Sequence, residues 1–239
     1  HEVGHALGVM HANGWDCQDQ ALHGNCQHLE YGNYFDTMGH GSNALHFNAF
    51  YKEKLGWIHP SEALTISQSG SYSINPLELA SSTVKLTKIK PAGFVSAPFY
   101  LEFRRPLLFD ENLVKPELEA NQDGLMVNKI IDPTSFWAFP RLVDMSPTTA
   151  KWYDDTKRAV LERGQTFSDL GYGLSSLTTV ATSSTGVTFD INLTTPICVR
   201  HQPTFGYDSW PLPVAVGGGG NVGINFINGD TPTCGSSLF

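Results

Sequence analysis

The first eleven residues, HEVGHALGVMH, constrain this chain more than any other stretch of its sequence. On a helix, at about 100° per residue, His1 and His5 lie one turn apart on the same face. Gly8 can adopt a positive φ at little energetic cost, so we expect it to end the helix and turn His11 back toward the other two rings. The sequence therefore predicts a helix and a reversal that bring three imidazoles together.

Three neutral imidazoles suit a divalent metal ion, above all Zn²⁺, and leave a fourth coordination position for water. Glu2 follows the first histidine and is the candidate general base and acid for that water. The pattern HExxHxxGxxH thus predicts Zn²⁺ as cofactor and hydrolysis of peptide bonds as the reaction. In the competing interpretation a downstream carboxylate is the third ligand; Glu30 is then the candidate, and His11 has no role.

The opposite face of this predicted helix carries Val3, Ala6, Leu7 and Met10, which we expect to pack on a core. After it, residues 12–43 read as an irregular region rich in Gly and Asn, and residues 45–55 as a second helix that Gly56 ends in the left-handed conformation. Short apolar runs beyond residue 60 predict strands at 63–66, 71–74, 84–89, 99–103, 125–131 and 187–193, with a final hairpin. We therefore expect three parts, at residues 1–60, 61–195 and 196–239.

Three segments, HEVGHALGVMHANGWDC, EYGNYFDTMGHG and HFNAFYKEKLGWI, together resemble the gametolysin-type family of secreted metzincin zinc peptidases. The resemblance implies an α+β fold. Its first part would be the C-terminal part of a metzincin-like catalytic domain, with an active-site helix, a Met-turn and a second helix. A β-sandwich-like domain and the start of an immunoglobulin-like β domain would follow.

The resemblance also assigns roles to single residues. His1, His5 and His11 would be the zinc ligands, Glu2 the general base, and Met38 the methionine of the turn beneath the metal. Tyr31 and Tyr34, on either side of Gly32 and Asn33, are candidate hydrogen-bond donors to the oxyanion or the substrate, although aromatic packing around the turn explains them equally well.

Members of this family cleave proteins of the extracellular matrix or cell wall, so the resemblance implies a protein or peptide substrate. The sequence starts at the first histidine of the motif, and we expect it to be a segment of a longer precursor. The upstream half of a metzincin catalytic domain would then be missing, and the isolated segment is expected to bind zinc and cleave peptides poorly.

Charge and cysteine content limit the partners and the compartment. The net charge of -8, with only 16% charged residues, argues against nucleic acid as a partner, and no apolar run is long enough to span a membrane. The four cysteines form a near pair, Cys17 and Cys26, and a far pair, Cys198 and Cys234, whose spacing suits two disulfides and a secreted protein. Four reduced thiols are the alternative.

A function of a different class is also open. The β-rich region would act as a secreted binding or adhesion module, and the zinc site would be structural or decayed. A structural zinc site is closed by a fourth protein ligand, and His28 or Asp36 would be the candidate. The fourth position therefore separates the two functions.

Overall fold

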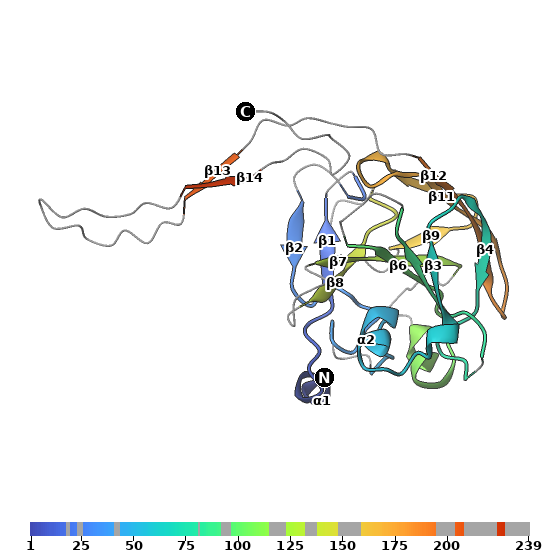
Figure 1. The fold of residues 1–239 in the computed structure, drawn as a ribbon. Coiled ribbons are helices and arrows are strands. Elements are labelled where there is room, and N and C mark those ends of the chain that lie inside the picture. The colour runs from blue at the N-terminus through green and yellow to red at the C-terminus, as the bar shows by residue number, and fades with distance from the viewer. Residues whose placement is uncertain are drawn as a thin grey trace, which may run out of the picture.

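The computed structural model describes residues 1–17, 20–22, 26–40, 44–80, 82–91, 97–114, 123–131, 138–147, 159–194, 204–207 and 224–227. These residues form mostly β-strands (Figure 1). Helix α1 (Glu2–Ala6) has five residues and α2 (Ala49–Lys54) has six. The 3-10 helices are η2 (Pro60–Glu62), η3 (Leu108–Val114) and η5 (Leu170–Tyr172). No helix in the described ranges is long and apolar enough to cross a membrane.

The larger of the two main sheets is mixed and contains eight strands, in the order β2-β1-β8-β7-β6-β5-β3, with β9 also paired to β7. Its strands are β1 (Asn13–Asp16), β2 (Gln27–Leu29), β3 (Ala63–Ile66), β5 (Leu86–Ile89), β6 (Phe99–Glu102), β7 (Gly124–Ile131), β8 (Phe139–Val143) and β9 (Val160–Glu162). The pairs β1–β8 and β3–β5 are parallel, and the other pairs are antiparallel.

The second sheet is antiparallel, in the order β10-β11-β12-β4. Its strands are β10 (Thr166–Asp169), β11 (Leu174–Thr182), β12 (Val187–Leu193) and β4 (Gly70–Ile74). Strand β12 alternates buried Val187, Phe189 and Ile191 with more exposed residues, as expected for a strand with one face on a core. A separate hairpin pairs β13 (Thr204–Tyr207) with β14 (Ile224–Ile227).

Apolar side chains cover both faces of the large sheet. On one face, Leu101 and its neighbours pack against residues of the second sheet, among them Leu177 and Phe189. On the other face, Tyr100 packs in a second core with Phe50 of α2 and with Met38. All four residues of β6 are therefore buried, and the loop that holds Met38 rests on the sheet.

The prediction of an α+β fold is wrong. That prediction placed a metzincin-like active-site helix, a Met-turn and a second helix ahead of separate β domains. The described residues form a mostly β protein, and α1 and α2 are too short to make a helical layer. Residues 12–43 were expected to be irregular, but they contribute β1 and β2 to the large sheet. Gly8, at φ 88°, stops α1 soon after it begins, since glycine takes this conformation without a Cβ clash.

The second predicted helix, residues 45–55, begins four residues too early. Asn48 is its N-cap, and its side chain accepts a hydrogen bond from the Tyr51 N–H (3.0 Å). Gly56 has the positive φ that was predicted, 73°. Strands β3 and β12 match their predicted bounds, and the final hairpin is formed by β11 and β12.

The predicted division at residues 60 and 195 stays a prediction, as does the immunoglobulin-like character of residues 196–239. The large sheet takes strands from both sides of residue 60. Cys198 and Cys234 lie outside the described residues.

Candidate metal centre

His1, His5 and His11 lie together, and their potential ligand atoms are all within 4.8 Å of one another. The ring centroids are 4.9 Å apart for His1 and His5, 5.4 Å for His1 and His11, and 4.8 Å for His5 and His11. Helix α1 places the first two rings one turn apart. The reversal at Gly8 brings the third ring to them, and each ring is partly exposed to solvent.

Each ring is held through its Nδ1 atom. His1 Nδ1 lies 2.7 Å from the Thr37 carbonyl, His5 Nδ1 3.0 Å from the Val9 carbonyl, and His11 Nδ1 2.8 Å from Glu30 Oε1. Carbonyl and carboxylate oxygens only accept hydrogen bonds, so each neutral ring carries its proton on Nδ1. The lone pair is then on Nε2, so each ring can bind a metal through that atom, and the oxygen partners fix the ring orientation.

The spacing of the rings is compatible with Zn²⁺. Zn–N distances of about 2.0–2.1 Å in a tetrahedral site place the ligand nitrogens about 3.4 Å apart. The ligand atoms in this structure lie within 4.8 Å of one another, so a small inward movement of the rings brings them to this spacing. In the described part of the chain, no further His, Cys, Asp or Glu joins this group. Three imidazoles would hold the ion and leave one position open.

Glu30 is placed beside the site rather than in the third ligand position, because its carboxylate binds the far side of the His11 ring. This geometry disfavours the competing interpretation in which Glu30 replaces His11. Glu2 lies in the first turn of α1 next to His1, with an exposed side chain that makes no hydrogen bond to another described residue.

The outer face of α1 does not pack on a core in this structure, contrary to the prediction. Val3 is 72% exposed and Leu7 is 48% exposed, and Ala6 is also exposed. In Figure 1, α1 lies at the end of the molecule away from the second sheet. The helix touches the rest of the protein mainly through its inner face, where Gly4 is buried.

Met38 lies directly against that inner face. A Cβ added to Gly4 would be 2.3 Å from Met38 Sδ, so the thioether occupies the space that glycine leaves open. Met38 is fully buried, and its carbonyl accepts a hydrogen bond from the Ala12 N–H (2.9 Å). The loop that contains Met38 thus supports both the helix with the first two histidines and the segment that follows His11.

Asp36 holds this loop in shape. Its side chain accepts hydrogen bonds from the N–H groups of Met38 and Asn48, 2.6 Å each, and from the Asn48 side-chain amide. Burial raises the Asp36 pKa to about 6, although these donors oppose the increase. With its oxygens occupied inside the protein, Asp36 is not placed as a fourth zinc ligand.

The two candidate tyrosines have different surroundings. The Tyr31 ring lies 4.0 Å from the His11 ring and 5.8 Å from the His1 ring, at the edge of the histidine cluster. Tyr31 has a positive φ of 61°, and its backbone N–H donates a hydrogen bond to Asn13 Oδ1. Tyr34 is buried and stacks on His40. Of the two, only Tyr31 is brought to the histidines.

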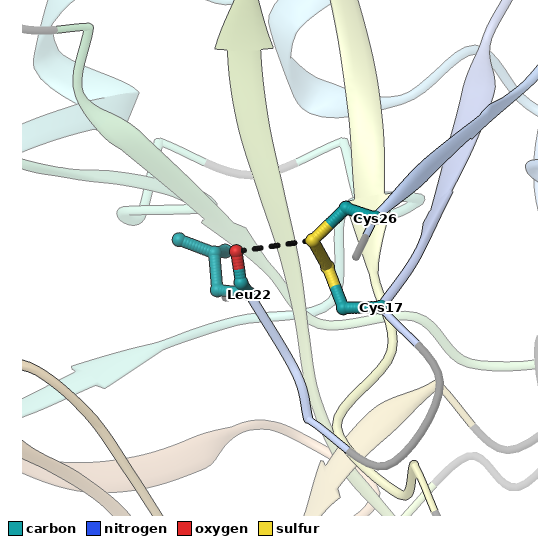
Figure 2. Close-up of a disulfide and its surroundings, with 3 residues drawn as sticks. All are labelled: Cys17, Leu22 and Cys26. Carbon is teal, nitrogen blue, oxygen red and sulfur yellow. Dashed lines mark hydrogen bonds between the residues drawn. A yellow bond between two sulfur atoms is a disulfide. The ribbon is translucent and has the colours of Figure 1, made fainter. Parts of the chain in front are cut away.

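A disulfide closes the loop between β1 and β2, as predicted for the near cysteine pair. Figure 2 shows the bond between Cys17 and Cys26, with the Leu22 carbonyl 3.5 Å from the Cys26 sulfur. Strand β2 leads directly to Glu30 and Tyr31, so the bond restrains the strand pair that carries two neighbours of the histidine cluster. The far pair, Cys198 and Cys234, is not described.

Two features were not predicted from the sequence. One is the contact of Glu30 with His11. The other is a buried ionic network in which Arg104 pairs with Glu78, Glu102 and Asp110. Glu102 and Arg104 are two positions apart, on either side of Phe103, which places both charged side chains on the same face of an extended segment. That spacing was a usable signal for an internal ion pair, because charged residues in an apolar strand need partners.

Comparisons of the chain with family models, with curated proteins and with solved structures found no match.

Proposed function

We propose that this chain is a zinc-dependent endopeptidase that hydrolyses peptide bonds of extracellular or cell-wall proteins. One observation carries the proposal. His1, His5 and His11 converge, and each has its Nδ1 atom engaged by an oxygen, which leaves three Nε2 lone pairs for one metal ion. The likeness of the motif segments to gametolysin-type peptidases supports the same proposal. The disulfide, which favours an oxidising compartment, supports secretion.

Zn²⁺ bound by the three histidines would supply a Lewis acid that polarises the substrate carbonyl and lowers the pKa of water. The chain's own contribution is Glu2, which would take the proton of the attacking water and deliver it to the departing amine. A C–O bond forms as the peptide C–N bond breaks. Tyr31, at the edge of the cluster, would donate a hydrogen bond to the carbonyl oxygen as negative charge develops there.

The alternative, a binding module with a closed structural zinc site, has less support. It needs a fourth protein ligand, and none of the described residues provides one. His28 is exposed on β2 and lies beside Phe139, while the carboxylate of Asp36 is already hydrogen-bonded inside the protein.

The test is to measure zinc content and peptide hydrolysis in the same preparations of the full protein. We expect one equivalent of zinc and hydrolysis of fluorescently labelled denatured protein. Glu2→Gln should keep the zinc and lose at least about a hundredfold in rate, whereas His11→Phe should lose both. Glu111→Gln, at an exposed carboxylate of η3, is the matched control and should behave like the wild type.

Two results contradict the proposal. If Glu2→Gln hydrolyses the substrate at the wild-type rate, the assignment of the general base is wrong. If wild-type protein with one equivalent of zinc cleaves none of a broad set of protein substrates, the closed-site alternative is favoured.

A further inference from the structure

A pocket of about 450 Å³ lies beside the Met38 loop, and its lining includes Thr37, whose carbonyl accepts the hydrogen bond from His1. Its walls come from the loop at Thr37, from residues 45–47, from α2 and the residues after it, from residues 77–80 and from η3. The lining includes Lys52, His46, Phe47, Trp57, Leu77 and Phe109. Its volume is in the range of small-molecule sites.

Lys52 brings a buried ammonium group to this pocket. The residue is only 9% exposed, and the ion pairs of the neighbouring carboxylates in the described part of the chain are with Arg104 rather than with Lys52. Burial lowers the Lys52 pKa to about 8, so the side chain is still mainly charged at neutral pH. A buried charge without a partner is energetically unfavourable, and an anion in the pocket would relieve that cost.

The carboxylates near Lys52 pair with Arg104. Glu78 also lines the pocket with an unpartnered Oε2 atom, and burial raises its pKa to about 8, so it is mainly neutral at neutral pH. The Glu102 carboxylate accepts hydrogen bonds from the Ala49 N–H and from Arg104. The Asp110 carboxylate accepts from the His46 N–H (2.8 Å) and from Arg104 Nε (2.7 Å). Glu78 Oε1 also accepts from Arg104 Nε, at 2.9 Å. Arg104 thus gathers the three acidic groups, and Lys52 is left without a hydrogen-bonded counterion.

His46 adds a second polar group at the pocket wall. Its Nε2 atom is buried and has no hydrogen-bond partner. Burial, together with the charge of Lys52, lowers the His46 pKa to about 4, so the ring is neutral at physiological pH. A neutral imidazole can still donate one hydrogen bond to an oxygen of a ligand.

Three aromatic side chains give the pocket an apolar part. The rings of Phe47 and Trp57 stack with centroids 5.5 Å apart, and the Phe109 ring packs edge-on against His46. Trp57 is 54% exposed and Phe109 is 73% exposed, so much of this aromatic surface is in contact with solvent. A planar or branched apolar group would bury it.

We propose that this pocket binds a small organic carboxylate that carries an aromatic or branched apolar group. The carboxylate accepts a hydrogen bond from Lys52 and, once the His46 ring turns its buried Nε2 atom into the pocket, a second one from His46. The apolar group lies against Phe47, Trp57 and Phe109. Neither the zinc site nor Glu2 takes part. Binding of the carboxylate therefore does not require the proposed peptidase function.

The experiment measures binding of 3-phenylpropionate to the full chain by titration calorimetry, beside the neutral 3-phenylpropanol, the cationic 3-phenylpropylamine and inorganic phosphate. We expect the carboxylate to bind most tightly. Lys52→Met should weaken the carboxylate at least about tenfold and leave the alcohol unchanged, since it removes a charge-assisted bond and keeps the volume. Lys54→Met, at an exposed lysine of the same helix, is the control.

A second variant keeps the test decisive if Lys52→Met does not fold. Ala80 is exposed at the pocket wall, so Ala80→Trp should block the pocket and abolish binding without removing a buried contact. Equal binding of alcohol and carboxylate, tighter binding of the amine, phosphate binding as tight as the arylpropionate, or no binding at millimolar concentration would each overturn the proposal. None of these readouts depends on zinc or on hydrolysis.

Discussion

At the scale of single residues, the carboxylate of Glu30 has the clearest functional position outside the motif. It binds Nδ1 of His11 while its own side chain is 61% exposed. Outer partners of this kind fix the tautomer of a metal-binding histidine and make the ring a better ligand. In the proposed zinc site Glu30 is thus a positioning residue, and its effect is expected in metal affinity.

Glu30→Ala is expected to weaken zinc binding about ten- to a hundredfold, because His11 loses the acceptor that orients it. Glu30→Gln keeps an oxygen acceptor and should restore most of the affinity. Competition with a chromophoric chelator measures both variants. An affinity for Glu30→Ala equal to that of the wild type would show that the His11–Glu30 contact has no role in metal binding.

Lys129 is a second residue whose surroundings have a measurable consequence. Its Nζ atom has no hydrogen-bond partner and lies 3.2 Å from the centroid of the Tyr172 ring and 4.1 Å from that of Phe99. Burial lowers the Lys129 pKa to about 7, and Asp169 opposes this only in part. Between pH 7 and the ordinary lysine range, the unfolded chain therefore binds more protons than the folded one, so this group makes stability rise with pH.

Lys129→Met should raise the free energy of unfolding by about 1–2 kcal/mol at pH 6, because an apolar side chain of similar length replaces a buried unpaired charge. The gain should shrink as the pH approaches 10, where the wild-type lysine is neutral. Urea unfolding at pH 6 and at pH 9.5 measures both values. A gain that is the same at both pH values would contradict this account.

At the scale of elements, the contact between α1 and the Met38 loop determines whether the first two histidines are held. Gly4 has no Cβ, and the Met38 sulfur fills the space beside it. The helix has five residues and an exposed outer face. Its stability therefore depends on this packing more than on its own hydrogen bonds, since isolated helices of this length do not persist in water.

Gly4→Ala should destabilise the protein by about 1–3 kcal/mol, because the added methyl group overlaps Met38, and it should weaken zinc binding as well. Thermal unfolding and zinc titration provide the two readouts. Gly70→Ala is the matched control, because its Cβ would meet only ordinary contacts with the Tyr72 ring at 3.4 Å or more. Equal stability of the two variants would contradict the proposed role of the contact.

The sequence predicted those elements whose signal is local. Gly8 and Gly56 have the expected positive φ angles, and β3 and β12 were visible as apolar runs between turn residues. Strand β1 was missed because NGWD has little strand propensity and is extended through pairing with β8, more than a hundred residues away. The start of α2 was misplaced because the capping role of Asn48 depends on Tyr51 and Asp36, and the second of these contacts is tertiary.

In the candidate site, too, the local features could be predicted from the sequence and the long-range contacts could not. The grouping of the three histidines follows from helix periodicity and one glycine, and the spacing of the motif contains both. The contact that orients His1 is with Thr37, 36 positions along the chain, and the contact that orients His11 is with Glu30, 19 positions along. No periodic pattern encodes such contacts, so they emerged only from the folded arrangement.

At the scale of the whole molecule, the large sheet has a core on each face, and the histidine cluster lies beyond one end of it. The link between the two is the segment from Ala12 to β2, closed by the Cys17–Cys26 bond. The position of the cluster relative to the sheet therefore depends on a strand pair at the sheet edge.

Replacing both Cys17 and Cys26 with serine should lower the free energy of unfolding by about 2–3 kcal/mol, the value expected for a disulfide that closes a loop of this length. Zinc affinity should fall too, because β2 leads into Glu30. Denaturant unfolding and zinc competition are measured with and without a thiol reductant. Reductant should destabilise the wild type more than the double variant, in which only Cys198 and Cys234 remain; an equal response of both proteins would contradict this role of the bond.

The parallel pairing of β1 with β8 also has a consequence for biosynthesis. Strand β1 pairs with residues 141–143 on one side and with β2 on the other, so only the β2 partner is present soon after β1 leaves the ribosome. More than a hundred further residues must be translated before β8 exists. Nascent chains therefore expose the three imidazoles without the support of β8 until residues 141–143 have emerged, and the proposed metal centre is expected to mature only after that point.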